Sequence, residues 1–140
     1  MFAKAEPGSA NVDSRDAAIF VFADDLGVFP SVRDAESYHE PWAENRVKGV
    51  YDRHGNVFHL TAFNARGGGV TIKPVDPPLN RRDEFVERLR DHLDKVAELR
   101  PDLLQKEWVA HAPGDDLVRW CTEREMMPRY VERQRPWRFW

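Results

Sequence analysis

Residues 17–23, which read AAIFVFA, decide the fold. Seven consecutive apolar residues are too few to cross a bilayer, and their alternating β-branched and aromatic side chains favour a strand buried on both faces. Such a strand belongs in the interior of a sheet. It ends at Asp24 and Asp25, whose charges must reach solvent or a partner. We expect residues 26–30, which include a glycine and a proline, to form a loop.

Three more strands are predicted further along the chain. Apolar and polar side chains alternate in residues 57–64, and a connection of hairpin length that contains a glycine joins them to a strand at 46–52. A fourth strand is expected at 70–73. A short helix precedes the hairpin and begins after Ser31, whose hydroxyl can accept hydrogen bonds from first-turn amides. The order strand, helix, three strands predicts an antiparallel four-stranded sheet.

The C-terminal half of the chain is predicted to be helical. Between Phe85 and Ala97 apolar residues recur at steps of 4, 4, 3 and 1, which is the stripe of an amphipathic helix over residues 80–100. Shorter helices are expected after Pro101 and after Asp115. The sequence therefore predicts an α+β fold with the C-terminal helices packed on one face of the sheet.

Composition indicates one soluble globular domain. Of the 140 residues, 41% are hydrophobic and 32% charged, against averages of about 45–50% and about 25%. We interpret residues 1–16 as a flexible leader, 17–127 as a single α+β domain and 128–140 as a basic aromatic tail. The single cysteine, Cys121, excludes an internal disulfide. Together with an N-terminus that lacks the pattern of a signal peptide, it favours a cytoplasmic location.

The net charge of −3 hides an uneven distribution. Residues 1–45 hold nine acidic and three basic side chains, whereas residues 128–140 hold four basic and one acidic. Arginines interleaved with aromatic residues in the tail are typical of single-strand nucleic-acid binding. The alternative, which we favour because the chain as a whole is acidic, is that the tail docks on the domain.

The acids after the first strand are the strongest candidates for chemistry. Residues 23–27 read ADDLG, which partly resembles the Asp-x-Asp-Gly motif of haloacid-dehalogenase-like phosphatases, with the second acid out of register. Asp24 and Asp25 therefore belong either to an exposed loop or to a catalytic or metal site. The five histidines lack the spacing of a metal site, and Cys121 lies on an apolar helix face typical of core packing. We predict no catalytic residue, metal or cofactor outside that alternative.

Two stretches carry a family resemblance. Residues 31–42 (SVRDAESYHEPW) and 50–56 (VYDRHGN), the latter followed by an apolar strand, resemble small bacterial immunity proteins of polymorphic or contact-dependent toxin systems. The resemblance covers residues 19–75. It implies a cytosolic α+β protein that binds one toxin domain tightly and blocks its active site.

The acidic N-terminal third is where we expect such a partner to bind. An aromatic anchor among carboxylates suits a tight interface with a basic protein such as a nuclease. The predicted partner-binding residues are Asp24, Asp25, Asp34, Glu36, Glu40, Trp42 and Glu44.

Overall fold

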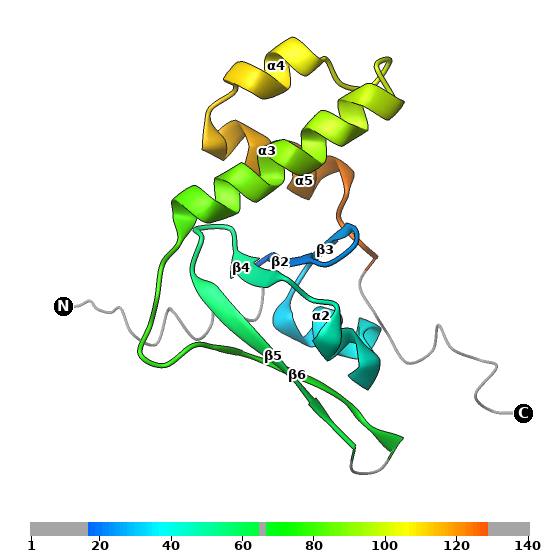
Figure 1. Cartoon of the computed structure of the whole chain (residues 1–140), viewed down its shortest axis with the longest axis vertical. Coiled ribbons are helices and arrows are strands. Elements are labelled where there is room, and N and C mark those ends of the chain that lie inside the picture. Colours follow the sequence, from blue (N-terminus) through cyan, green and yellow to red (C-terminus); the bar gives the residue numbers. More distant parts are fainter. Residues whose placement is uncertain (1–16, 65–66, 129–140) are drawn as a thin grey trace, which may run out of the picture.

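The computed structural model describes residues 17–64 and 67–128 (Figure 1). The predicted leader at 1–16 lies outside this part of the chain. So does the predicted tail, apart from Pro128. The described residues form a sheet with helices on both of its faces, which confirms the α+β class.

The sheet has five strands, so the predicted number of four is wrong. All neighbouring strands are antiparallel, in the order β3-β2-β4-β5-β6. The strands are β2 (Ile19–Phe22), β3 (Leu26–Phe29), β4 (Gly49–Asp52), β5 (Val57–Phe63) and β6 (Gly69–Pro74).

The additional strand, β3, lies where the sequence predicted a loop. It pairs with β2, and the pair nearest the turn is Phe22 with Leu26. Asp24 and Asp25 therefore lie in the turn of a hairpin. Gly27 belongs to this strand, and a Cβ atom there would lie 2.8 Å from the ring of Phe29. The glycine therefore accommodates a neighbouring aromatic ring, whereas in the sequence it looks like a strand breaker.

Strand β2 lies inside the sheet, between β3 and β4, and is buried on both faces as predicted. Phe20 and Phe22 belong to the core cluster beneath the C-terminal helices. Ile19 and Val21 point to the opposite face and belong to a second cluster. The period of two residues that is inherent to a strand thus divides one apolar run between two cores.

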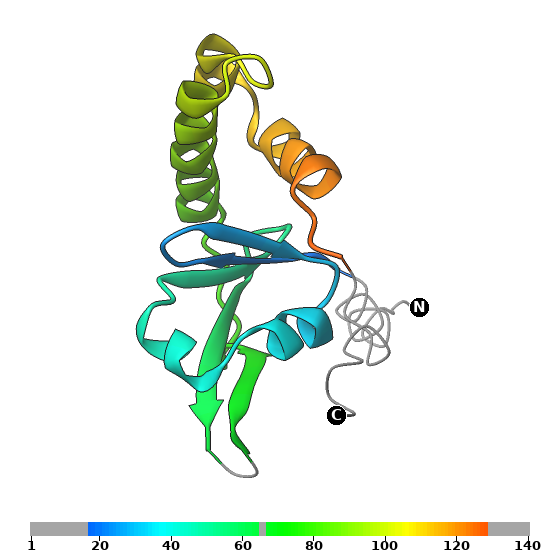
Figure 2. The same cartoon turned by 90° about the vertical axis from the view of Figure 1, so that its right-hand side faces the viewer.

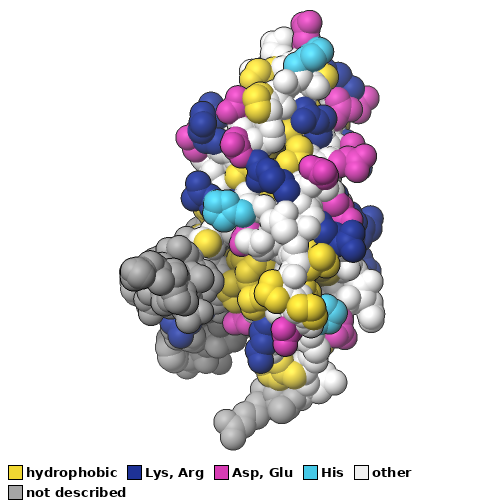
Figure 3. All heavy atoms as spheres, turned by 90° about the vertical axis from the view of Figure 1, so that its left-hand side faces the viewer, with side chains coloured by type: hydrophobic (Ala, Val, Ile, Leu, Met, Phe, Trp, Pro, Cys, Tyr) yellow, Lys and Arg dark blue, Asp and Glu magenta, His cyan; other side chains and the backbone are white. Residues whose placement is uncertain are grey.

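The first core is covered by the C-terminal helices, α3 (Arg82–Leu99), α4 (Lys106–His111) and α5 (Gly114–Arg124), which we call the helical layer (Figure 2). Phe85 of α3 packs on Phe20 and Tyr51, with ring centroids 5.0 and 5.2 Å apart. Acidic and basic side chains are interspersed over the outside of this layer, in the upper part of Figure 3. Within the described residues, no helix combines the length and the apolar character needed to cross a bilayer.

The second core is covered by α2 (Val32–Tyr38), which is followed by the 3₁₀ helix η1 (Pro41–Asn45). Helix α2 begins as predicted, because Ser31 Oγ accepts a hydrogen bond from the Asp34 amide at 3.2 Å. The same hydroxyl donates to Asp34 Oδ2 at 2.7 Å. This reciprocal contact fixes the point at which the chain leaves β3 and turns under the sheet.

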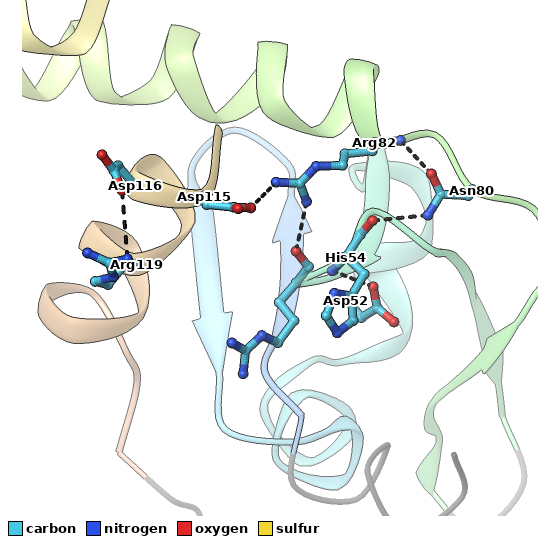
Figure 4. A network of polar contacts seen from close by, with 8 residues as sticks. Asp52, His54, Asn80, Arg82, Asp115, Asp116 and Arg119 are labelled. Atoms are coloured by element: carbon cyan, nitrogen blue, oxygen red, sulfur yellow. Dashed lines mark hydrogen bonds and ion pairs between the residues drawn. The ribbon is translucent and has the colours of Figure 1, made fainter. Parts of the chain in front are cut away.

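The predicted hairpin between β4 and β5 is confirmed, and its loop is held against α3 (Figure 4). Asp52 Oδ1 accepts from the amide of His54 at 2.8 Å, and Asn80 Nδ2 donates to the His54 carbonyl at 3.0 Å. Gly55 has φ +87°, and a Cβ atom there would lie 2.5 Å from the Arg82 Cα. Only glycine fits this close approach without displacing the start of α3.

The chain after α5 returns to the outer edge of β3. Val28 and Met126 form a parallel bridge, and the Met127 amide donates to the Val28 carbonyl at 2.7 Å. This contact pairs part of an edge strand that would otherwise be exposed. It also brings Met127 to the surface that carries the candidate site.

A candidate protein-binding groove

A groove of about 250 Å³ lies between the β2–β3 turn and the α2–η1 segment. Its floor is apolar and includes Val21, Phe29 and Met127. We call it the Trp42 groove, and its polar and aromatic lining consists of Asp24, Asp25, Tyr38, His39, Trp42 and Arg46.

Two large aromatic side chains of the groove are exposed. Tyr38 is 58% and Trp42 62% exposed, whereas Phe29, which also lines the groove, is buried. Tyr38 packs on Phe29 with ring centroids 5.1 Å apart, and His39 contacts both rings. Exposed aromatic side chains next to a hollow are an informative surface feature, because single apolar residues scattered over a surface are normal but clusters mark binding sites.

A guanidinium group lies at the mouth of the groove. Arg46 Nη1 donates to Asp24 Oδ2 at 3.1 Å, and the guanidinium carbon lies 5.5 Å from the centre of the Trp42 ring. Asp25 is exposed beside this pair, and its carboxylate makes no contact of this kind within the described residues. The groove thus joins aromatic rings with carboxylates.

His39 lies deeper in the groove and is held in one orientation. Its Nδ1 lies 2.8 Å from the Ala35 carbonyl oxygen. Because a carbonyl can only accept, Nδ1 carries the proton, and in the neutral ring Nε2 is an acceptor. Burial lowers the pKa of His39 and outweighs the hydrogen bond to Ala35, which by itself would raise the pKa. The neutral imidazole is therefore favoured in the folded protein.

The seven predicted partner-binding residues fall into two groups. Asp24, Asp25 and Trp42 line the groove together, and Glu40 is exposed at the start of η1. The remaining three make contacts within the fold. They are Asp34, Glu36 and Glu44.

Each acid of the second group has a structural partner. Asp34 is only 4% exposed and accepts from Ser31, so its carboxylate does not lie on the surface. Glu36 Oε2 accepts from the backbone amide of Ile72 at 2.8 Å, and Glu44 Oε2 from that of Ala62 at 3.1 Å. Glu36 therefore fastens α2 to β6, and Glu44 fastens η1 to β5.

Sequence reasoning did not identify Tyr38, His39 or Arg46 as groove residues. The sequence predicted that Arg46 begins a strand, whereas it directly follows η1 and the strand β4 begins at Gly49. Tyr38, Trp42 and Arg46 recur every four residues, which is the spacing of one side of an α-helix. The structure does not use this spacing, because α2 ends at Tyr38 and the extended residues His39 and Glu40 separate it from η1.

The other candidates for chemistry are placed differently. Cys121 is completely buried among the helical-layer side chains, as predicted for a packing residue. Burial and the neighbouring Glu125 raise the pKa of its thiol far above the usual range. Within residues 17–64 and 67–128, no three His, Cys, Asp or Glu side chains are grouped so that they could hold a metal ion. The arginines and aromatic residues of the predicted nucleic-acid site lie outside the described residues.

Comparisons with known protein families, with curated proteins and with solved structures find no match for this chain.

Proposed function

We propose that this chain is a protein-binding immunity protein that neutralises a cognate bacterial toxin by occluding its active site. The observation that carries the proposal is the pair of exposed aromatic side chains, Tyr38 and Trp42, over a groove with carboxylates at its rim. The immunity role rests on the resemblance of residues 31–42 and 50–56, and the groove supplies a surface on which such a partner can bind.

The chemistry of the groove suits a tight interface with a basic protein. Binding energy is concentrated in a few aromatic and arginine side chains that enter well-packed pockets, while surrounding polar groups exclude water. Carboxylates at the rim accelerate association with a positively charged partner more than they raise affinity. Asp24, Asp25 and Glu40 provide this charge, and the partner would contribute the complementary surface.

The experiment compares capture of the partner by two tryptophan variants. The tagged full-length protein, Trp42→Ala and Trp108→Ala are incubated with lysate of the source cell, and eluted proteins are identified by mass spectrometry. Trp108 is the matched control, because it is partly exposed on α4 of the helical layer. We expect one stoichiometric partner with a toxin-like domain, lost with Trp42→Ala and retained with Trp108→Ala.

The captured toxin domain then provides the functional assay. Co-expression of the wild-type protein should restore growth of cells that produce the domain, and Trp42→Ala should not. Equal capture and equal protection by the two variants would remove the groove from the proposal. Capture of a partner that is not toxic would remove the immunity role.

A further inference from the structure

The Trp42 groove already binds one guanidinium group, that of Arg46. This group is 3.1 Å from Asp24 and 5.5 Å from the centre of the Trp42 ring. A carboxylate and an aromatic face are the two groups that recognise arginine, because the guanidinium is planar, carries several donors and stacks on rings. The contacts of Arg46 therefore indicate that this surface can bind a guanidinium group.

We propose that an arginine side chain of the partner binds in the Trp42 groove in place of Arg46. Arg46 then acts as an internal competitor that is displaced when the partner arrives. The inference rests on the proposed function, since it names the chemical group that the groove recognises in a protein partner.

Arg46 is held weakly enough to be displaced. The side chains of Arg46 and Asp24 are 60% and 74% exposed, and ion pairs in such positions contribute little to stability because water screens them. The backbone of Arg46 is anchored separately, by its amide donating to the Ala43 carbonyl at 2.8 Å. The side chain can therefore leave the groove while η1 stays folded.

A partner arginine can make more contacts in the groove than Arg46 makes. Asp25 offers a second carboxylate beside Asp24, without an ion pair in the described part of the chain. Tyr38 offers a second exposed ring. Covering these groups with a partner surface removes water, which strengthens both the ion pair and the cation–π contact.

A peptide titration tests this inference without the natural partner. Hexaarginine and hexalysine are added to the ¹⁵N-labelled full-length protein, and the indole N–H signal of Trp42, assigned with Trp42→Phe, is followed by NMR. We expect hexaarginine to shift this signal at lower concentration than hexalysine, because lysine is a compact, strongly hydrated cation without a planar face.

Variants of two exposed ion pairs separate displacement from general electrostatic attraction. Arg46→Gln should raise the affinity for hexaarginine about threefold to fivefold, and Asp24→Asn should lower it by a similar factor. The matched controls are Lys106→Gln and Asp94→Asn. They change the same charges in an exposed pair of the helical layer, where Lys106 Nζ lies 3.6 Å from Asp94. The controls should change the affinity by less than about twofold.

Several results would overturn the inference. Equal binding of both peptides would mean that only net charge is recognised, and weaker binding by Arg46→Gln would make Arg46 part of the binding surface. If the Trp42 signal without peptide depends on protein concentration, a second copy of the chain occupies the groove. If the signal changes when residues 129–140 are removed, those residues of the same chain occupy it. If the captured toxin needs Trp42 but is indifferent to Asp24→Asn and Arg46→Gln, only the arginine inference fails.

Discussion

The two faces of strand β2 support layers that differ in how they are held and in what they expose. Towards the helical layer, Phe20 and Phe22 meet Phe85 in a dense aromatic core. Towards α2, the smaller Ile19 and Val21 belong to a second core that also includes Phe29 and Phe58. Carboxylates complete that attachment, because Glu36 and Glu44 accept hydrogen bonds from strand amides.

This difference indicates that the helical layer serves mainly the stability of the fold and the α2–η1 layer mainly the recognition of a partner. A core of interlocking rings contributes most of the apolar burial that stabilises a domain. The α2–η1 layer consists of two short helices, and it leaves Tyr38 and Trp42 exposed around a groove. We therefore expect substitutions in the helical layer to act mainly on folding, and substitutions at the groove to act mainly on partner binding.

The largest effect is expected from Phe85→Ala. Phe85 is completely buried and contacts three aromatic rings, so its truncation should reduce the free energy of unfolding by about 3–5 kcal/mol. Urea denaturation measures the change. Phe63→Ala is the control, because Phe63 is 45% exposed at the end of β5 and its truncation should cost only about 1 kcal/mol. Similar losses in both variants would show that the helical layer is not the dominant core.

A smaller loss of stability is expected from Ser31→Ala. The substitution removes the cap of α2 and the hydroxyl that donates to the buried Asp34, which should cost about 1–2 kcal/mol. Hydrogen exchange should accelerate mainly at the α2 amides and hardly at all in α3. Ser37→Ala, at an exposed position of the same helix, provides the comparison. Faster exchange throughout the sheet would contradict a local role for the cap.

Sequence patterns predicted elements whose signal lies within one segment. The amphipathic stripe from Phe85 to Ala97 led to α3, and the hydroxyl of Ser31 marked the start of α2. Strand β3 was missed because its glycine and the proline after it are typical of a loop. Its four residues become a strand by pairing with β2, and that information is not contained in the segment itself.

The candidate site was predictable to the extent that acids and an aromatic residue lay close in sequence. Asp24, Asp25 and Trp42 do converge. The uses of Glu36 and Glu44 were not predictable, because the strand amides that they contact, those of Ile72 and Ala62, lie 36 and 18 positions further along the chain. Carboxylates that bind a partner and carboxylates that hold a fold together look alike until the fold is known.

Acidification should weaken the α2–η1 layer through His39. Because burial lowers the pKa of His39 in the folded state, the unfolded chain binds this proton more readily. The contribution of the neutral imidazole is complete above the ordinary histidine pKa of about 6.5 and is lost as the pH falls through the lower pKa of the folded state. His39→Gln should therefore flatten the stability profile in this acidic range.

The control for this titration is His111→Gln. His111 makes the same kind of contact, from Nδ1 to the Glu107 carbonyl four residues earlier, but it is exposed on α4. Urea unfolding of the two variants from pH 7.5 to pH 5 separates the effects of burial and of hydrogen bonding. An equal change of slope in both variants would contradict burial as the cause.

The smallest change in stability, and the sharpest test of the comparison, is expected from Trp42→Ala. The substitution removes mainly the contact between Trp42 and Arg46. An exposed cation–π contact contributes about 0.5–1 kcal/mol at most to stability. Partner affinity should instead fall by more than about thirtyfold, which corresponds to the roughly 2 kcal/mol of an interface hot spot. Phe85→Ala should behave in the opposite way, because its remaining folded molecules keep the groove. Calorimetric titration with the captured partner, without denaturant and at a temperature at which both variants are folded, compares their affinities directly. If Phe85→Ala lowers the intrinsic affinity as much as Trp42→Ala does, the two layers are coupled, and stability and recognition are not separable in this fold.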